Sequence, residues 1–181
     1  MPGRRAVLLG SLACASDAEA QSGVWPEWQG QYAGTLRFYR SIPLEDIYPP
    51  PAQPHVDQDD TAPIPCRFSI DTSDGLPVVW LRIDDGPMQT SDSGETLRFT
   101  RLIAGAASLI SATAKPEPRS ASLTVRPDSL GTETLFGFAD GSFWRRHFNA
   151  RFTASGADLI VWVFDANGTR ARTWRGSVAR L

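Results

Sequence analysis

The last third of the chain alternates apolar runs with short turn pairs, which is the pattern of an antiparallel meander. Three turn pairs separate the runs: Asp140-Gly141, Ser155-Gly156 and Asn167-Gly168. Such dipeptides tolerate the positive φ angles of tight hairpin turns, and Asn-Gly between apolar runs is the strongest short-range hairpin signal. Strands are therefore predicted over residues 133–139, 142–153, 157–165 and 169–179.

The same alternation upstream predicts further strands over residues 30–40, 66–71, 76–84, 95–103, 107–113 and 119–126. In the stretch 95–103, Leu97, Phe99 and Ile103 fall on one face. No stretch keeps apolar residues at helical spacing over about ten residues, so no long helix is expected. This pattern is typical of an all-β barrel or sandwich. We predict a single antiparallel up-and-down β-barrel of about 8–10 strands, with a β-sandwich as the alternative.

The predicted strand 157–165 is apolar on both faces. Leu159, Val161 and Val163 share one face, whereas Ile160, Trp162 and Phe164 share the other. A strand that is covered on both faces belongs in the middle of a sandwich, or in the wall of a barrel with a lined interior.

Residues 1–20 resemble a secretory signal peptide. Arg4-Arg5 is followed by an apolar stretch over residues 6–15, and Ala18-Glu19-Ala20 supplies the small-x-small cleavage pattern before Gln21. The arginine pair also fits the twin-arginine export route. The apolar stretch is too short to cross a bilayer, so no transmembrane segment is predicted. We therefore expect a periplasmic or secreted protein whose residues 21–181 form one domain.

Composition narrows the classes of function. The net charge is −2 at pH 7, and no basic patch or nucleic-acid-binding module is recognisable, so nucleic acid is not an expected partner. Cleavage of the signal leaves Cys66 as the single cysteine, so the exported domain has no internal disulfide and depends on packing for its stability.

Residues 41–65 carry seven prolines and an acidic cluster. Such a segment cannot supply the donors of a strand ladder, and we expect a long connection that crosses one end of the barrel. His55, Asp57, Asp59 and Asp60 place oxygen and nitrogen ligands close together there. The spacing lacks the turn-forming Gly and the closing Glu of a calcium loop, so a solvated acidic loop is favoured and no metal is predicted.

The strand 142–153 carries the most suggestive polar residues. Its polar row consists of Arg145, His147, Asn149 and Arg151, whereas Arg146 shares the other face with apolar side chains. If the polar row faces a lumen, it offers donors to an anionic head group such as a carboxylate. If it faces outward, it is ordinary surface, and this is favoured because apolar faces usually point to the core. The candidate ligand-binding residues are Arg145, His147, Arg151, Val161 and Trp162.

Two local motifs support a family resemblance. Gly23-Val24-Trp25 matches the G-x-W of lipocalins, and Trp28-Gln29-Gly30-Gln31-Tyr32 is similar to the W-x-G-x-x opening of bacterial lipocalin-like barrels. With an Arg-rich last strand, the chain resembles the calycin superfamily. The resemblance implies that Trp25 or Trp28 plugs the closed end of a barrel. It also implies that Arg172 or Arg175, which flank Trp174, stacks over that Trp.

We expect a binding module that holds a small apolar or amphipathic ligand in its lumen. Six aromatic side chains are candidates to line the lumen: Trp80, Phe99, Phe136, Phe138, Trp162 and Phe164. The alternatives are a structural or interaction protein of the cell envelope, with the Pro-rich segment as its contact, and a cofactor-free cyclase, isomerase or hydrolase that uses His147 with a lumenal Arg or Asp. No catalytic motif favours the enzyme, and no cofactor is predicted, since a haem-binding role for His147 has little support.

Overall fold

A computed structural model describes residues 28–40, 62–83, 94–168 and 170–181. The predicted signal peptide, Trp25, most of the Pro-rich segment and its acidic cluster lie outside the described residues. The predictions made for those segments therefore remain predictions.

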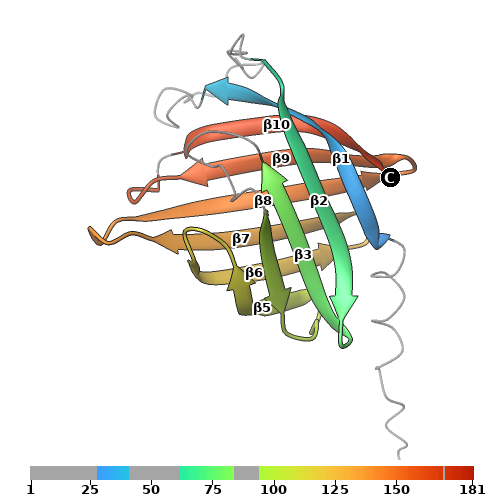
Figure 1. Ribbon diagram of the computed structural model, residues 1–181, viewed down its shortest axis with the longest axis horizontal. Helices are drawn as coiled ribbons and strands as arrows, with labels where there is room; N and C mark the ends of the chain where they lie inside the picture. Colours follow the sequence, from blue (N-terminus) through green and yellow to red (C-terminus); the bar gives the residue numbers. More distant parts are fainter. Residues whose placement is uncertain (1–27, 41–61, 84–93, 169) are drawn as a thin grey trace, which may run out of the picture.

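The described chain is all-β and forms a closed barrel of ten antiparallel strands (Figure 1). The strands are β1 (Gly30–Arg40), β2 (Ile64–Ser73), β3 (Leu76–Ile83), β4 (Glu95–Phe99), β5 (Ala106–Thr113), β6 (Pro118–Arg126), β7 (Ser129–Gly137), β8 (Phe143–Thr153), β9 (Gly156–Phe164) and β10 (Arg170–Arg180). Each strand pairs with its neighbours in sequence, and β1 pairs with β10 to close the cylinder. The predicted up-and-down barrel is confirmed, and the sandwich alternative is wrong.

The side chains that alternate inward on each strand form one core. Phe68 on β2 and Phe148 on β8 meet edge to face with their ring centroids 5.4 Å apart. These strands are not neighbours in the wall, so the two rings meet through the interior. The largest fully buried side chains of the described chain, which include Trp174, Phe99 and Leu36, belong to this core. The interior around them is packed with side chains.

Trp28 packs at one end of the barrel. Its ring stacks on Phe152 with centroids 4.5 Å apart, and the Tyr32 hydroxyl donates a hydrogen bond of 3.0 Å to its carbonyl oxygen. The arginine at this end is Arg180, whose guanidinium donates to the carbonyl of Gln29. Arg172 pairs with Arg40 at the far end of the β1–β10 ladder, so it is remote from Trp28.

One predicted strand end and one predicted turn differ from the structure. β4 ends at Phe99, and Ile103 is 75% exposed in a tight turn in which Ala104 and Gly105 have φ angles of 50° and 77°. Ile103 therefore does not extend the apolar face of that strand. Gly156 has no positive φ; instead a Cβ added there would lie 1.9 Å from the carbonyl oxygen of Val178. This glycine is needed for the close approach of β9 to β10 rather than for a turn.

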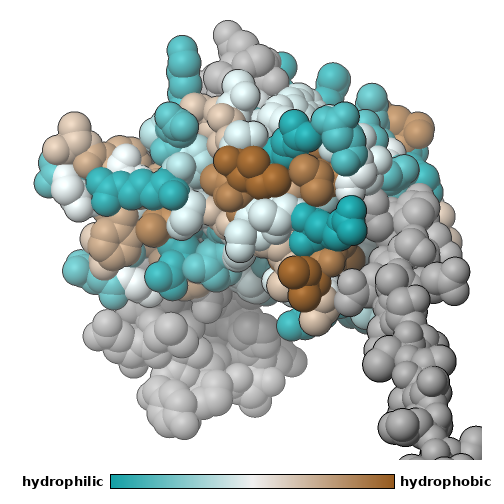
Figure 2. Space-filling model, turned by 90° about the horizontal axis from the view of Figure 1, so that it is seen from below, coloured by the Kyte–Doolittle hydropathy of each residue, from teal (hydrophilic) through white to brown (hydrophobic). Residues whose placement is uncertain are grey.

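The outside of the barrel mixes polar and apolar side chains. Figure 2, a view from below, shows separate hydrophobic patches surrounded by hydrophilic residues. Within the described ranges, no helix has the length and apolar character that crossing a bilayer requires.

Candidate functional site

A buried ion pair crosses the interior of the barrel. Arg146 on β8 donates from Nη2 to Oε1 of Glu95 at the start of β4. The two side chains are only 3% and 4% exposed. β4 and β8 are separated by three other strands on the shorter path around the wall, so the pair spans the interior. Two opposite charges are thus enclosed in a largely apolar core.

Not every polar atom beside this pair has a partner. Thr134 lies directly opposite Arg146 in the β7–β8 ladder, so both side chains point inward at the same level. The Arg146 guanidinium also lies over the ring of Phe136, with its central carbon 5.0 Å from the centroid. Among the described residues, neither Nε of Arg146 nor Oγ1 of Thr134 has a hydrogen-bond partner.

The energetic cost of this arrangement indicates a function beyond packing. A buried polar atom without a partner costs about 1–3 kcal/mol. Replacing a buried ion pair with well-packed apolar residues is often neutral or stabilising, so the pair is not a strong source of stability. A neutral oxygen placed between Arg146 and Thr134 would satisfy both unpartnered atoms. The arrangement therefore presents one unpartnered donor and one unpartnered hydroxyl to the interior.

The ion pair lies toward the end of the barrel opposite Trp28. Phe148 and Ala150, deeper on the inward face of β8, are completely buried. Trp144, on the same face but farther from Trp28, is only partly buried, as are Phe38 on β1 and Arg172 on β10. Inward side chains that lie beyond the ion pair, on the side away from Trp28, are thus partly exposed to solvent. We call Arg146, Glu95, Thr134, Phe136 and Trp144 the inner polar site.

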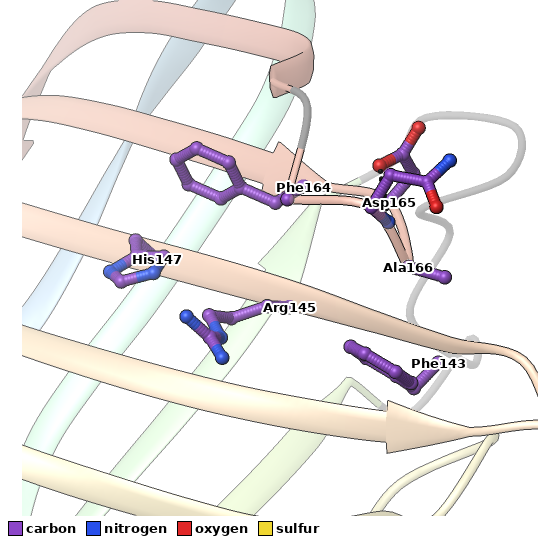
Figure 3. Close-up of a pocket in the computed structure, with 8 residues that line it drawn as sticks. Phe143, Arg145, His147, Phe164, Asp165 and Ala166 are labelled. Atoms are coloured by element: carbon purple, nitrogen blue, oxygen red, sulfur yellow. Dashed lines mark hydrogen bonds between the residues drawn. The ribbon is translucent and has the colours of Figure 1, made fainter.

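A second feature lies on the outer wall. A groove of about 360 Å³ is lined by Phe143, Arg145, His147, Phe164 and the turn that follows β9. Figure 3 shows Arg145 and His147 beside each other on β8, with Phe164 reaching toward them from β9. Glu133 on β7 contacts both polar side chains, at 3.3 Å from Nε of Arg145 and 3.7 Å from Nε2 of His147.

The environment of His147 favours its neutral form. Burial lowers the pKa of His147 from its ordinary value of 6.5, and the charge of Arg145 lowers it further, whereas Glu133 acts in the opposite direction. The edge of the imidazole also meets the Phe164 ring, with centroids 5.2 Å apart. His147 therefore lies in a partly desolvated position on the outer wall, away from the interior.

The structure brings only some of the predicted ligand-binding residues together. Arg145 and His147 share the outer groove, and Trp162 lies opposite His147 in the β8–β9 ladder. Arg151 is 76% exposed farther along β8, where it pairs with Asp128 at 3.3 Å. Val161 faces the interior and is completely buried. The polar row thus faces outward, which is the alternative that the sequence favoured.

Several other predicted residues have clear positions. Of the six aromatic candidates for the lumen, Phe99 and Phe136 are buried inward, whereas Trp80, Trp162 and Phe164 alternate outward and Phe138 follows the end of β7. Trp174 is buried in the core against Phe38, with ring centroids 5.5 Å apart. Arg175 is exposed on the outer wall.

Arg146, Glu95 and Thr134 were not selected from the sequence. One signal was present, because Arg146 is the single charged residue in an otherwise apolar row of its strand. The partner was not predictable, since Glu95 is 51 residues away and meets Arg146 only after the barrel closes.

The described residues contain no cluster of three or more His, Cys, Asp or Glu side chains that is able to hold a metal ion. Comparison of the chain with models of known protein families, with curated proteins and with solved structures finds no match. The candidate function therefore depends on the geometry of the site alone.

Proposed function

We propose that this protein is an exported, lipocalin-like carrier that binds a small apolar or amphipathic molecule in the part of its barrel opposite Trp28. The observation that carries the proposal is the inner polar site, where a buried ion pair lies beside two polar atoms without partners. A molecule with one polar group and an apolar body would satisfy those atoms. Its body would pack on Phe136 and Trp144.

The barrel supports this proposal in two ways. Trp28 and Phe152 stack at one end, and the inward side chains Trp144 and Arg172 at the other end are partly exposed, so the ligand would approach from the latter. The deeper core is filled by Phe148, Phe99 and other fully buried side chains. The ligand would therefore occupy the outer part of the interior rather than its whole length.

Titration of the mature protein with a fluorescent long-chain alcohol analogue tests the proposal. Saturable binding is expected, and native mass spectrometry should detect a retained small molecule after gentle purification. The double variant Arg146→Met with Glu95→Leu should weaken binding about tenfold or more, since it removes the central donor of the site without leaving either charge buried alone. Arg37→Met is the matched control because Arg37 is exposed on the outer wall of β1. Absence of both saturable binding and a retained ligand would refute the proposal.

Export is proposed from the sequence of residues 1–20. Expression of the full chain in a bacterial host should yield a periplasmic or secreted product that begins at Gln21, as measured by intact mass. A full-length product that stays in the cytoplasm would contradict export without affecting the proposed binding site.

The enzyme alternative loses its structural basis at one position. It required His147 beside a lumenal Arg or Asp, whereas His147 lies on the outer wall with Glu133 and Arg145. The binding function is therefore the one that the inner polar site favours.

A further inference from the structure

The inner polar site has no net charge, and this restricts the ligand that it accepts. Arg146 and Glu95 neutralise each other, and their side chains are 3% and 4% exposed. A carboxylate head group would place a second negative charge beside one buried cation. Burial of an uncompensated charge is strongly unfavourable, so an anionic head is disfavoured at this level of the barrel.

The two unpartnered atoms define the chemistry that is missing. Nε of Arg146 is a donor and requires an acceptor, whereas the Thr134 hydroxyl both donates and accepts. An ammonium head cannot accept from Arg146 and is excluded on that ground. A hydroxyl accepts from Nε and donates to Oγ1, and a ketone oxygen accepts from both groups.

We infer that the ligand of the inner polar site is a long-chain molecule with a neutral oxygen head, an alcohol or a ketone, bound between Arg146 and Thr134. This inference rests on the proposed binding function. The apolar chain would lie along Phe136 and Trp144, directed away from Trp28. Arg172 on β10 also points inward, but it is only partly buried. Water therefore screens its charge, and it contributes little to the selection between charged and neutral head groups.

A head-group series on one chain length tests the inference with the mature protein. Dodecanol, 2-dodecanone, dodecanoate and dodecylamine are compared by displacement of the fluorescent analogue at neutral pH. The alcohol and the ketone should bind about tenfold more tightly than the carboxylate and the amine. Thr134→Val should weaken dodecanol about 3- to 10-fold, since one hydrogen bond is lost, and leave dodecane unchanged.

Glu95→Gln supplies the sharpest control because it leaves the Arg146 charge without a counter-ion. The preference should then change from dodecanol to dodecanoate. If this variant does not fold, the Thr134→Val comparison still decides the matter. Saturable binding with no head-group preference would mean that the head group does not bond to Arg146 and Thr134. Either that result or tightest binding of dodecanoate by the unmodified protein would overturn the inference and leave the proposed function intact. Failure of every compound to bind would refute both.

Discussion

Removal of one partner of the buried ion pair is expected to destabilise the barrel strongly. Glu95→Leu leaves the Arg146 guanidinium uncompensated among Phe136, Thr134 and other buried groups. Loss of one member of a buried pair costs about 3–5 kcal/mol. Since the side chains are 3% and 4% exposed, water cannot reduce this cost, and the full range applies.

Urea unfolding followed by tryptophan fluorescence measures the effect. With a slope of about 2 kcal/mol per molar urea, the midpoint should fall by about 2 M. The double variant Arg146→Met with Glu95→Leu should recover most of the loss, because neither charge remains buried. Arg146→Met alone should resemble Glu95→Leu alone.

A second ion pair on the same strand provides the matched control. Arg151 and Asp128 are 76% and 58% exposed, so Arg151→Met should change the free energy of unfolding by less than about 1 kcal/mol. If Glu95→Leu also costs less than about 1 kcal/mol, the pair is not desolvated. The physical basis of the inner polar site would then be wrong.

Three further outcomes are expected. Ala104→Asn should stabilise the protein by about 0.5–1 kcal/mol in urea unfolding, because Asn tolerates the φ of 50° at this position and forms the favoured Asn-Gly turn with Gly105; a loss of stability would contradict the assigned turn. Tyr32→Phe should cost about 1 kcal/mol by the same assay, since the carbonyl of Trp28 loses its donor, and an unchanged midpoint would argue against this contact. Burial lowers the pKa of His147 in the folded state below the ordinary 6.5, so the unfolded chain takes up a proton first as the pH falls. The free energy of unfolding should therefore decline below about pH 6.5, and His147→Asn should flatten that decline. Parallel pH profiles for both proteins would refute the assigned environment.

Alternation of apolar and polar residues was sufficient to predict nearly every strand of the barrel. The strand predicted over residues 30–40 coincides with β1. The strands predicted over residues 66–71 and 76–84 meet in a turn where Gly75 has positive φ, and Gly168 has positive φ in the predicted Asn167-Gly168 turn. Alternation predicts the wrong strand end at Ile103, because this apolar residue lies in a turn and is exposed to solvent. Local chemistry also misassigned Gly156, because its crowding arises from β10 and not from its own hairpin.

The inner polar site required long-range information that the sequence does not display. The polar row with Arg145 and His147 is the more conspicuous candidate in the sequence because several polar residues alternate there, but the row faces outward. Arg146, one position away, faces the core. Its isolation in an apolar row marks it as unusual, whereas its pairing with Glu95 depends on how the sheet curves across the interior. Buried polar residues in apolar rows are thus the more informative signal for sites inside a barrel.

The ladder between β1 and β10 joins strands from the two ends of the described chain, for example at Tyr32 and Arg180. The other ladders connect strands that follow each other in sequence, so they can form while the chain is still being synthesised. Closure must wait for the last strand. A nascent or truncated chain without β10 would present the open edges of β1 and β9, which invite edge-to-edge association and aggregation. β10 therefore completes the barrel wall, and its pairing with β1 and β9 removes the strand edges through which the chain could self-associate.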